Sequence, residues 1–101
     1  MENKRKYYLL DDGQVTTTDD LMAWAQWFET ADRRVAVTQV GEYEVSTVFL
    51  GIDHNFSGDG EPVLYETMVF LDGHGTDSER YTTREEAIVG HNRMVKRVQG
   101  G

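Results

Sequence analysis

The stretch Val63–Leu71, which reads VLYETMVFL, decides the fold because apolar side chains occupy both of its faces. Successive side chains of a strand point to opposite faces. The apolar members are Leu64, Met68 and Phe70 on one face, and Val63, Tyr65, Val69 and Leu71 on the other. A strand that is apolar on both faces is either central in its sheet or an edge strand covered by a partner.

A second long strand is predicted at Tyr43–Ile52, which reads YEVSTVFLGI. Its alternation places Val45, Thr47 and Phe49 on one face, and Ser46, Val48, Leu50 and Ile52 on the other. The second set is more apolar, so we expect it to face the helices. The polar loop Asp53–Pro62 joins this strand to Val63–Leu71, which predicts an antiparallel pair at the centre of the sheet.

Shorter strands and two helices surround this pair. The further strands are expected at Lys6–Leu10 with a short return at Val15–Thr17, at Val35–Thr38 before a Gly41–Glu42 hairpin turn, and at Glu79–Thr82. Apolar residues at helical spacing predict a first helix over Thr18–Asp32, capped by Thr17 or Thr18. A second helix follows Thr83, with Glu86 completing a capping box. Its expected buried stripe is Ala87, Ile88, His91, Met94, Val95 and Val98.

These elements predict a single α+β domain over residues 1–101. We expect an antiparallel sheet of four to five strands in the order β-α-β-β-β-β-α, with both helices packed on one face. The apolar character of both faces of Val63–Leu71 also suggests a homodimer.

Composition excludes several classes of function. The chain has 101 residues, no cysteine and a formal net charge of −8, so disulfides and thiolate chemistry are excluded. An acidic surface argues against direct binding to nucleic acid or to an anionic membrane. The N-terminal sequence lacks the apolar stretch of a secretory signal, so we expect a cytoplasmic protein. No phosphate-binding glycine motif is present, and no cofactor is expected.

Two polar residues stand at positions that favour burial. Glu66 shares a strand face with Leu64, Met68 and Phe70, and His91 lies on the apolar stripe of the second helix. A buried carboxylate must be paired or protonated, and His91, Arg80 or Tyr81 can supply the partner. A Glu66–His91 pair would resemble a general acid–base couple. The structural alternative is a buried pair that ties the helix to the sheet.

Arginines supply a second candidate site. Arg33 and Arg34 lie at a helix–strand junction, and Arg80 follows a turn. If the three converge, they can hold a phosphate. Ordinary surface pairing with the many acidic residues is the alternative.

The loop that begins at Asp53 contains His54, and its polar residues are spaced similarly to the ligands of an EF-hand calcium loop. Asp53, Asn55 and Ser57 occupy the first, third and fifth positions, and Gly58 the sixth, but Leu64 stands where a bidentate glutamate is required. The loop is therefore predicted to be a polar connection without metal, and His54 is retained as a candidate for binding a ligand or partner.

The sequence contains VSTVFLGIDH at Val45–His54, YETMVF at Tyr65–Phe70, RYTT at Arg80–Thr83, the stretch from Glu86 to His91, and Trp24–Arg34. Together these stretches resemble a group of small uncharacterised proteins of bacteriophages and prophages. The resemblance covers about Tyr7 to Val98 and implies a viral accessory protein that acts in the cytoplasm of a bacterial host.

The resemblance and the acidic surface together favour a non-enzymatic binding protein. Its expected role is counter-defence (anti-CRISPR or anti-immune-signalling), through blocking a host protein or sequestering a nucleotide second messenger. A structural or assembly role in the virion or in replication is the alternative, and a small hydrolase that uses Glu66 and His91 is a third hypothesis.

Overall fold

The computed structural model describes residues 7–55 and 59–100 of the chain. Its elements, in chain order, are β1 (Tyr7–Asp11), β2 (Gln14–Thr18), α1 (Leu21–Thr30), β3 (Arg34–Val40), β4 (Tyr43–Phe49), β5 (Tyr65–Leu71), β6 (His74–Tyr81) and α2 (Arg84–Gly100). The predicted α+β class and the order of strands and helices are confirmed. The last strand, expected at Glu79–Thr82, begins earlier, at His74.

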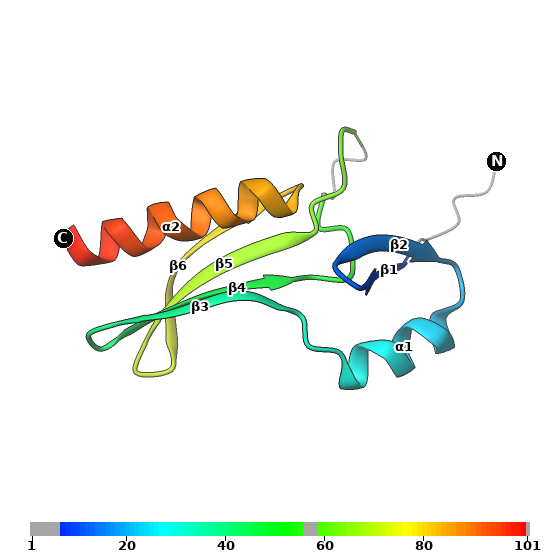
Figure 1. Cartoon of the computed structure of the whole chain (residues 1–101), viewed down its shortest axis with the longest axis horizontal. Coiled ribbons are helices and arrows are strands. Elements are labelled where there is room, and N and C mark those ends of the chain that lie inside the picture. Colours follow the sequence, from blue (N-terminus) through cyan, green and yellow to red (C-terminus); the bar gives the residue numbers. More distant parts are fainter. Residues whose placement is uncertain (1–6, 56–58, 101) are drawn as a thin grey trace.

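The main sheet has four antiparallel strands in the order β3-β4-β5-β6. Each strand pairs with its neighbour in the sequence, and β4 and β5 form the central pair, as predicted. Gly41 and Glu42 make the turn between β3 and β4, and Gly41 has a φ of 59°, a conformation that costs glycine little. Figure 1 shows α2 lying along one face of this sheet.

The start of α2 follows the predicted capping pattern. The Thr83 hydroxyl accepts a hydrogen bond from the Glu86 backbone N–H at 3.1 Å, and Glu86 accepts from both the hydroxyl and the backbone N–H of Thr82. These hydrogen bonds from Thr82 hold the pKa of Glu86 below its usual value. No helix in the described part of the chain is both long and apolar enough to cross a membrane.

The prediction of which face of β4 meets the helices was wrong. Val45, Thr47 and Phe49 are fully buried beneath α2, whereas Ser46 and Val48 lie on the other face. The polar side chain of Thr47 misled the comparison of the faces, because its hydroxyl is hydrogen-bonded within the protein and can therefore be buried at little cost.

Two apolar clusters lie between α2 and the sheet. One consists of Phe49, Leu64, Tyr65, Tyr81 and Ala87, and the other of Val45, Val69 and Met94. Burying one large apolar side chain of this kind contributes about 1.5–3 kcal/mol, so these clusters account for much of the stability of the sheet.

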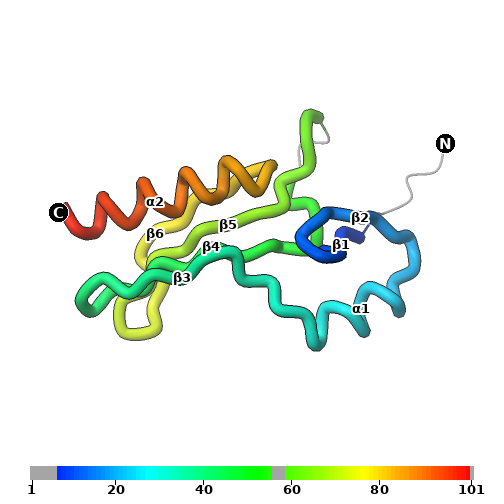
Figure 2. Tube along the Cα trace, viewed as in Figure 1, coloured from blue at the N-terminus to red at the C-terminus, as the bar shows by residue number. Residues whose placement is uncertain are grey.

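The first helix does not pack on the four-stranded sheet, contrary to the prediction. β1 and β2 form a separate two-stranded sheet, and α1 lies against these two strands (Figure 2). The Trp24 indole N–H donates to the carbonyl oxygens of Tyr8 and Gly51, each at 3.1 Å, which holds α1 on β1 just beyond the end of β4. Asp20, rather than Thr17 or Thr18, caps α1 by accepting from the Ala23 N–H.

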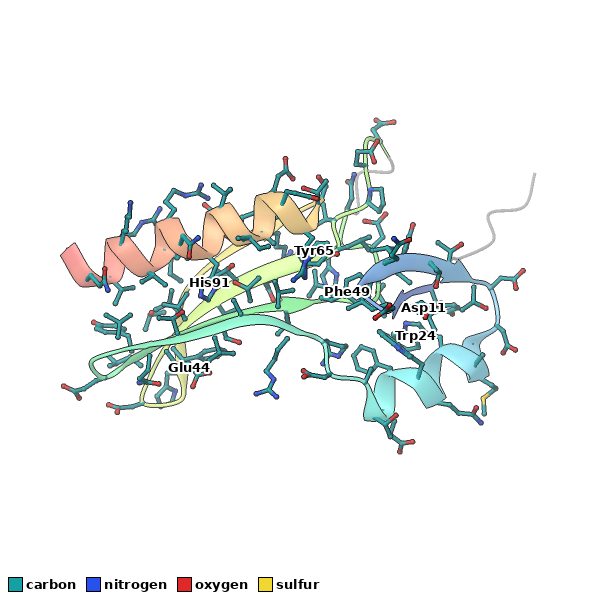
Figure 3. All side chains as sticks on the ribbon, viewed as in Figure 1. Asp11, Trp24, Glu44, Phe49, Tyr65 and His91 are labelled. Atoms are coloured by element: carbon teal, nitrogen blue, oxygen red, sulfur yellow. The ribbon has the colours of Figure 1, made fainter. Side chains whose placement is uncertain are left out.

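The second face of the four-stranded sheet is open. Among the described elements, α2 packs along the first face, where Trp27 of α1 also contacts Phe49, and none packs along the second face. The open face carries Glu44, Val48, Glu66, Met68 and Phe70. Figure 3 shows Glu44 and His91 on opposite sides of the sheet.

Candidate functional site

A cavity of about 560 Å³ lies between β6 and the first half of α2. Its volume falls within the range of small-ligand sites, which is about 300–1,000 Å³. The lining residues are Glu79, Arg80, Tyr81, Glu85, Glu86, Val89 and Arg93. Two predicted site residues, Arg80 and Tyr81, are among them.

Three of the five charged side chains that line this cavity, those of Glu79, Arg80 and Arg93, form ion pairs. The Arg80 guanidinium donates to the Glu66 carboxylate of β5 at 3.0 Å, so Arg80 is the partner of Glu66 among the three that were considered. Arg93 of α2 pairs with Glu79 of β6. Each arginine of the cavity therefore already contacts a carboxylate.

Tyr81 forms the floor of the cavity and is buried. Its hydroxyl donates to Glu79 at 2.9 Å. Burial, followed by the hydrogen bond and charge of Glu79, raises the pKa of Tyr81, so the phenol stays protonated near neutral pH. The Tyr81 ring lies so close to Gly90 of α2 that a Cβ atom at Gly90 would overlap the ring. Glycine at this position is what lets the helix approach β6 so closely.

His91 belongs to a buried network behind the cavity. Its Nδ1 lies 2.8 Å from the Thr47 hydroxyl, and its Nε2 lies 2.9 Å from the Thr38 hydroxyl. Thr47 is in turn hydrogen-bonded to Thr67. Burial lowers the pKa of His91, which therefore stays neutral near neutral pH.

These hydrogen bonds join α2 to three strands of the sheet. His91 of α2 contacts Thr38 of β3 and Thr47 of β4, and Thr47 contacts Thr67 of β5. A neutral imidazole has one N–H and one bare ring nitrogen, so His91 donates to one of its two threonines and accepts from the other.

Glu66 and His91 do not form the hypothesised pair. Glu66 lies on the open face of the sheet, beside Arg80, and His91 lies beneath α2 on the other face. The hypothesis assumed that the apolar neighbours of Glu66 in β5 face the helices, but Met68 and Phe70 belong to the open face. An acid–base couple of these two residues is therefore ruled out.

The three candidate arginines do not converge. The Arg33 guanidinium donates to the Phe49 carbonyl oxygen at 2.9 Å and lies 4.0 Å from the centre of the Phe28 ring. Arg34 pairs with Asp32. Arg34 and Arg80 stand in one row of the sheet but on its two edge strands, about 14 Å apart at three strand spacings. The predicted phosphate cluster is therefore absent from the described residues.

His54 is not among the described residues that line the cavity. It lies in the loop between β4 and β5, and its ring Nδ1 lies 2.9 Å from the Ile52 carbonyl oxygen. The Asp53 carboxylate accepts from the backbone N–H groups of Asn55 and Val63, each at 2.7 Å, and so closes the base of the loop. Ser57 and Gly58 of the EF-hand-like spacing lie outside the described residues. Within residues 7–55 and 59–100, no group of His, Asp or Glu is arranged to hold a metal ion.

Sequence reasoning missed five of the residues that line the cavity, namely Glu79, Glu85, Glu86, Val89 and Arg93. A signal for their location was Gly90, because a glycine inside a helix marks close contact with another element. Comparison of this chain with models of protein families, with curated proteins and with solved structures finds no match.

Proposed function

We propose that this chain is a non-enzymatic binding protein that recognises another protein through the cavity between β6 and α2. The observation that carries the proposal is an exposed apolar side chain beside charged residues that line the same cavity. Val89 is 63% exposed at the cavity, beside the buried ring of Tyr81. Interfaces between proteins commonly combine an apolar or aromatic centre with a polar rim.

A protein ligand suits this cavity better than a nucleotide. Phosphate recognition requires cationic side chains that are free to donate. Arg80 and Arg93 are paired with Glu66 and Glu79, and Glu85 and Glu86 add negative charge to the rim. This charge favours a partner that inserts an apolar side chain next to Tyr81 and places basic groups near Glu85 and Glu86.

The absence of a Glu66–His91 couple supports a role without catalysis. The two side chains lie on opposite faces of the sheet, and His91 is enclosed by hydrogen bonds to Thr38 and Thr47. We propose that the partner is a protein of a bacterial host, as the resemblance to phage accessory proteins implies. Blocking a component of host defence is the role that this partner class favours.

Affinity capture with matched variants tests the proposal. Val89→Glu places a charge in the apolar centre of the cavity, and Met22→Glu makes the same kind of change on an exposed residue of α1. We expect wild type and Met22→Glu to enrich the same protein from a bacterial lysate, and Val89→Glu to enrich it at least about tenfold less. Equal capture by all three proteins would contradict the assignment of the cavity.

A thermal-shift assay with a panel of nucleotides distinguishes this proposal from sequestration of a nucleotide. A ligand that binds the folded state raises the melting temperature. We expect no shift with cyclic dinucleotides or with mononucleotides. A shift that Arg80→Ala abolishes would favour the sequestering role instead.

A further inference from the structure

β6 is an edge strand of the main sheet, and none of the described elements lies beyond it. Within the described part of the chain, β6 contacts only β5 and α2. From Asp77 to Tyr81 it pairs with β5 in regular register, because the irregularity of this pair lies nearer the turn, between Val69 and Phe70. Tyr81 and the two residues before it line the cavity, so the regular part of the edge borders the cavity directly.

The backbone groups of β6 alternate between β5 and the outer edge. The Leu50 N–H donates to the Leu64 carbonyl oxygen, so the even-numbered residues from 64 to 70 direct their backbone groups to β4 and the odd-numbered residues direct theirs to β6. Glu79 and Tyr81 stand opposite odd-numbered residues of β5 and therefore point inward. Arg80 lies between them, so its N–H and C=O groups point away from the sheet.

Side chains of the protein already accept from the outward N–H groups on either side of Arg80. The Ser78 N–H donates to the Asp77 carboxylate at 2.8 Å, and the Thr82 N–H donates to Glu86 at 3.3 Å. The edge that is open to a partner is therefore short and centred on Arg80. A short edge fits a segment of a few residues better than the long edge of a second sheet.

The charges beside this edge are balanced within the protein. Arg80 pairs with Glu66 on the open face of the sheet, and Asp77 and Glu79 pair with arginines of α2. Charged side chains on an edge strand oppose unselective pairing between sheets. Because each of these charges has a partner, a short segment can lie beside them without burying an unpaired charge.

We propose that the partner protein binds through an extended segment that pairs antiparallel with β6 at Arg80. This inference rests on the proposed function and specifies how the partner fills the cavity. The partner residue opposite Arg80 exchanges two backbone hydrogen bonds with it. The partner residue before that one stands opposite Tyr81, so its side chain points to the face of the sheet that α2 covers. There it enters the cavity beside Val89, and we call it the inserted residue.

Charge complementarity specifies the chemistry of this segment. In an antiparallel pair, the partner residues that precede the inserted residue run toward the start of α2. Glu85 and Glu86 line the cavity at that end, and the ion pairs among the described residues include neither of them. A basic residue before an apolar inserted residue is therefore the complementary pattern.

Two substitutions at Arg80 test the backbone pairing. Arg80→Pro removes the outward N–H, and an edge strand accepts proline at such a position because no hydrogen bond of the sheet is lost. Arg80→Ala removes the same side chain and its pair with Glu66 but keeps the N–H, so the comparison of the two variants isolates the backbone. In affinity capture we expect Arg80→Pro to enrich the partner at least about tenfold less than Arg80→Ala. Equal melting temperatures would show that both variants are folded.

A synthetic peptide tests the same hydrogen bonds from the partner's side and uses the wild-type protein. The probe is Thr-Lys-Thr-Leu-Thr-Gln-Thr with blocked ends, in which leucine is the inserted residue and lysine precedes it. The control peptide carries a methyl group on the backbone nitrogen of the threonine after leucine, which removes the N–H directed at Arg80. We expect the probe to bind with a dissociation constant below about 1 mM, followed by the chemical shift of the Arg80 amide, and the control to bind at least about fivefold more weakly.

The outcomes separate the mode of binding from the proposed function. Weaker capture by Val89→Glu together with equal capture by Arg80→Pro and Arg80→Ala would keep the cavity as the binding site but overturn the strand pairing. Equal capture by Val89→Glu and wild type would contradict the proposed function itself. Equal binding of the two peptides, or no binding of either peptide up to about 1 mM, would also overturn the strand pairing.

Discussion

The sheet unit, which comprises β3–β6 and α2, and the hairpin unit, which comprises β1, β2 and α1, use their apolar residues differently. α1 reads LMAWAQWFET and is the more apolar helix, yet none of its residues is buried. α2 is rich in charged residues and buries Ala87, Gly90, His91 and Met94. The difference lies in the surface that each helix meets, because four strands offer a broad face and two strands offer a narrow one.

Phe49 connects the two units. Its ring centre lies 5.4 Å from that of Tyr65 within the sheet unit and 6.1 Å from that of Trp27 in α1. Both contacts are edge-on, which is a favourable arrangement of aromatic rings. We therefore expect a stable sheet unit, to which the hairpin unit is attached by a small number of contacts.

Gly90→Ala should produce the largest loss, because a Cβ atom there overlaps the Tyr81 ring and must displace α2 from β6. We expect the free energy of unfolding to fall by about 3 kcal/mol, measured by chemical denaturation. Gly100→Ala in the same helix is the control, since a Cβ atom at Gly100 has no neighbour within 4 Å. Equal stability of the two variants would contradict the close approach of Tyr81.

Trp24→Phe should weaken the hairpin unit alone. The variant keeps an aromatic ring but loses the indole donor to the carbonyl oxygens of Tyr8 and Gly51. We expect a local loss of about 1–2 kcal/mol, seen as faster hydrogen exchange of the Tyr8 amide, with exchange in β5 unchanged.

Trp27→Phe is the control for this change, because no described hydrogen bond uses the Trp27 indole. Faster exchange in β5 as well as in β1 would show that the two units unfold together. It would contradict the expectation that the hairpin unit opens while the sheet unit stays folded.

Acidification should destabilise the sheet unit through His91. Because burial lowers the pKa of His91 in the folded state, the unfolded chain binds its proton first as the pH falls. Stability should be constant above the ordinary histidine pKa of about 6.5 and decline below it, by at most about 1.4 kcal/mol per pH unit. Denaturation curves at several pH values measure this slope.

His91→Gln should remove this part of the slope, although it also lowers stability at neutral pH. His74→Gln changes an exposed histidine of β6 outside this buried network and serves as the control. A slope that survives His91→Gln would show that other groups cause the acid sensitivity.

Glu66→Gln should produce the smallest effect, about 1 kcal/mol or less, because its partner Arg80 is half exposed on the open face. Glu79→Gln makes the same change where the carboxylate accepts from both Tyr81 and Arg93, and should cost more. Chemical denaturation of both variants shows which of them loses more free energy of unfolding. A larger loss for Glu66→Gln would place that carboxylate among the contacts that hold the core.

Local sequence patterns predicted most of the fold. The alternation of apolar residues indicated the central pair β4–β5. Residues adjacent in the chain indicated the turn at Gly41 and Glu42 and the capping of α2. The packing of α1 could not be predicted in this way. It depends on the Trp24 hydrogen bonds to Tyr8 and Gly51, which join parts of the chain that are distant in sequence.

The candidate site was predicted in part. Arg80 and Tyr81 line the cavity, Glu66 is paired with Arg80, and His91 belongs to a separate group of hydrogen bonds with Thr38 and Thr47. Arg33, Arg34 and His54 have other partners. Reading Thr47 as a solvent-facing residue caused the main error, because the threonines and His91 satisfy one another in the interior.

The order of elements along the chain has a consequence for biosynthesis. All four strands of the sheet precede α2, so they leave the ribosome before the helix that covers them. Hairpins form within about 1–10 μs, far faster than a chain grows at about 5–20 residues per second, so each hairpin can form as soon as both of its strands have emerged. Until α2 emerges as well, the faces of Val45, Phe49 and Val69 that it covers stay accessible to chaperones and to other nascent chains. Folding of the sheet is therefore completed only when the last element emerges.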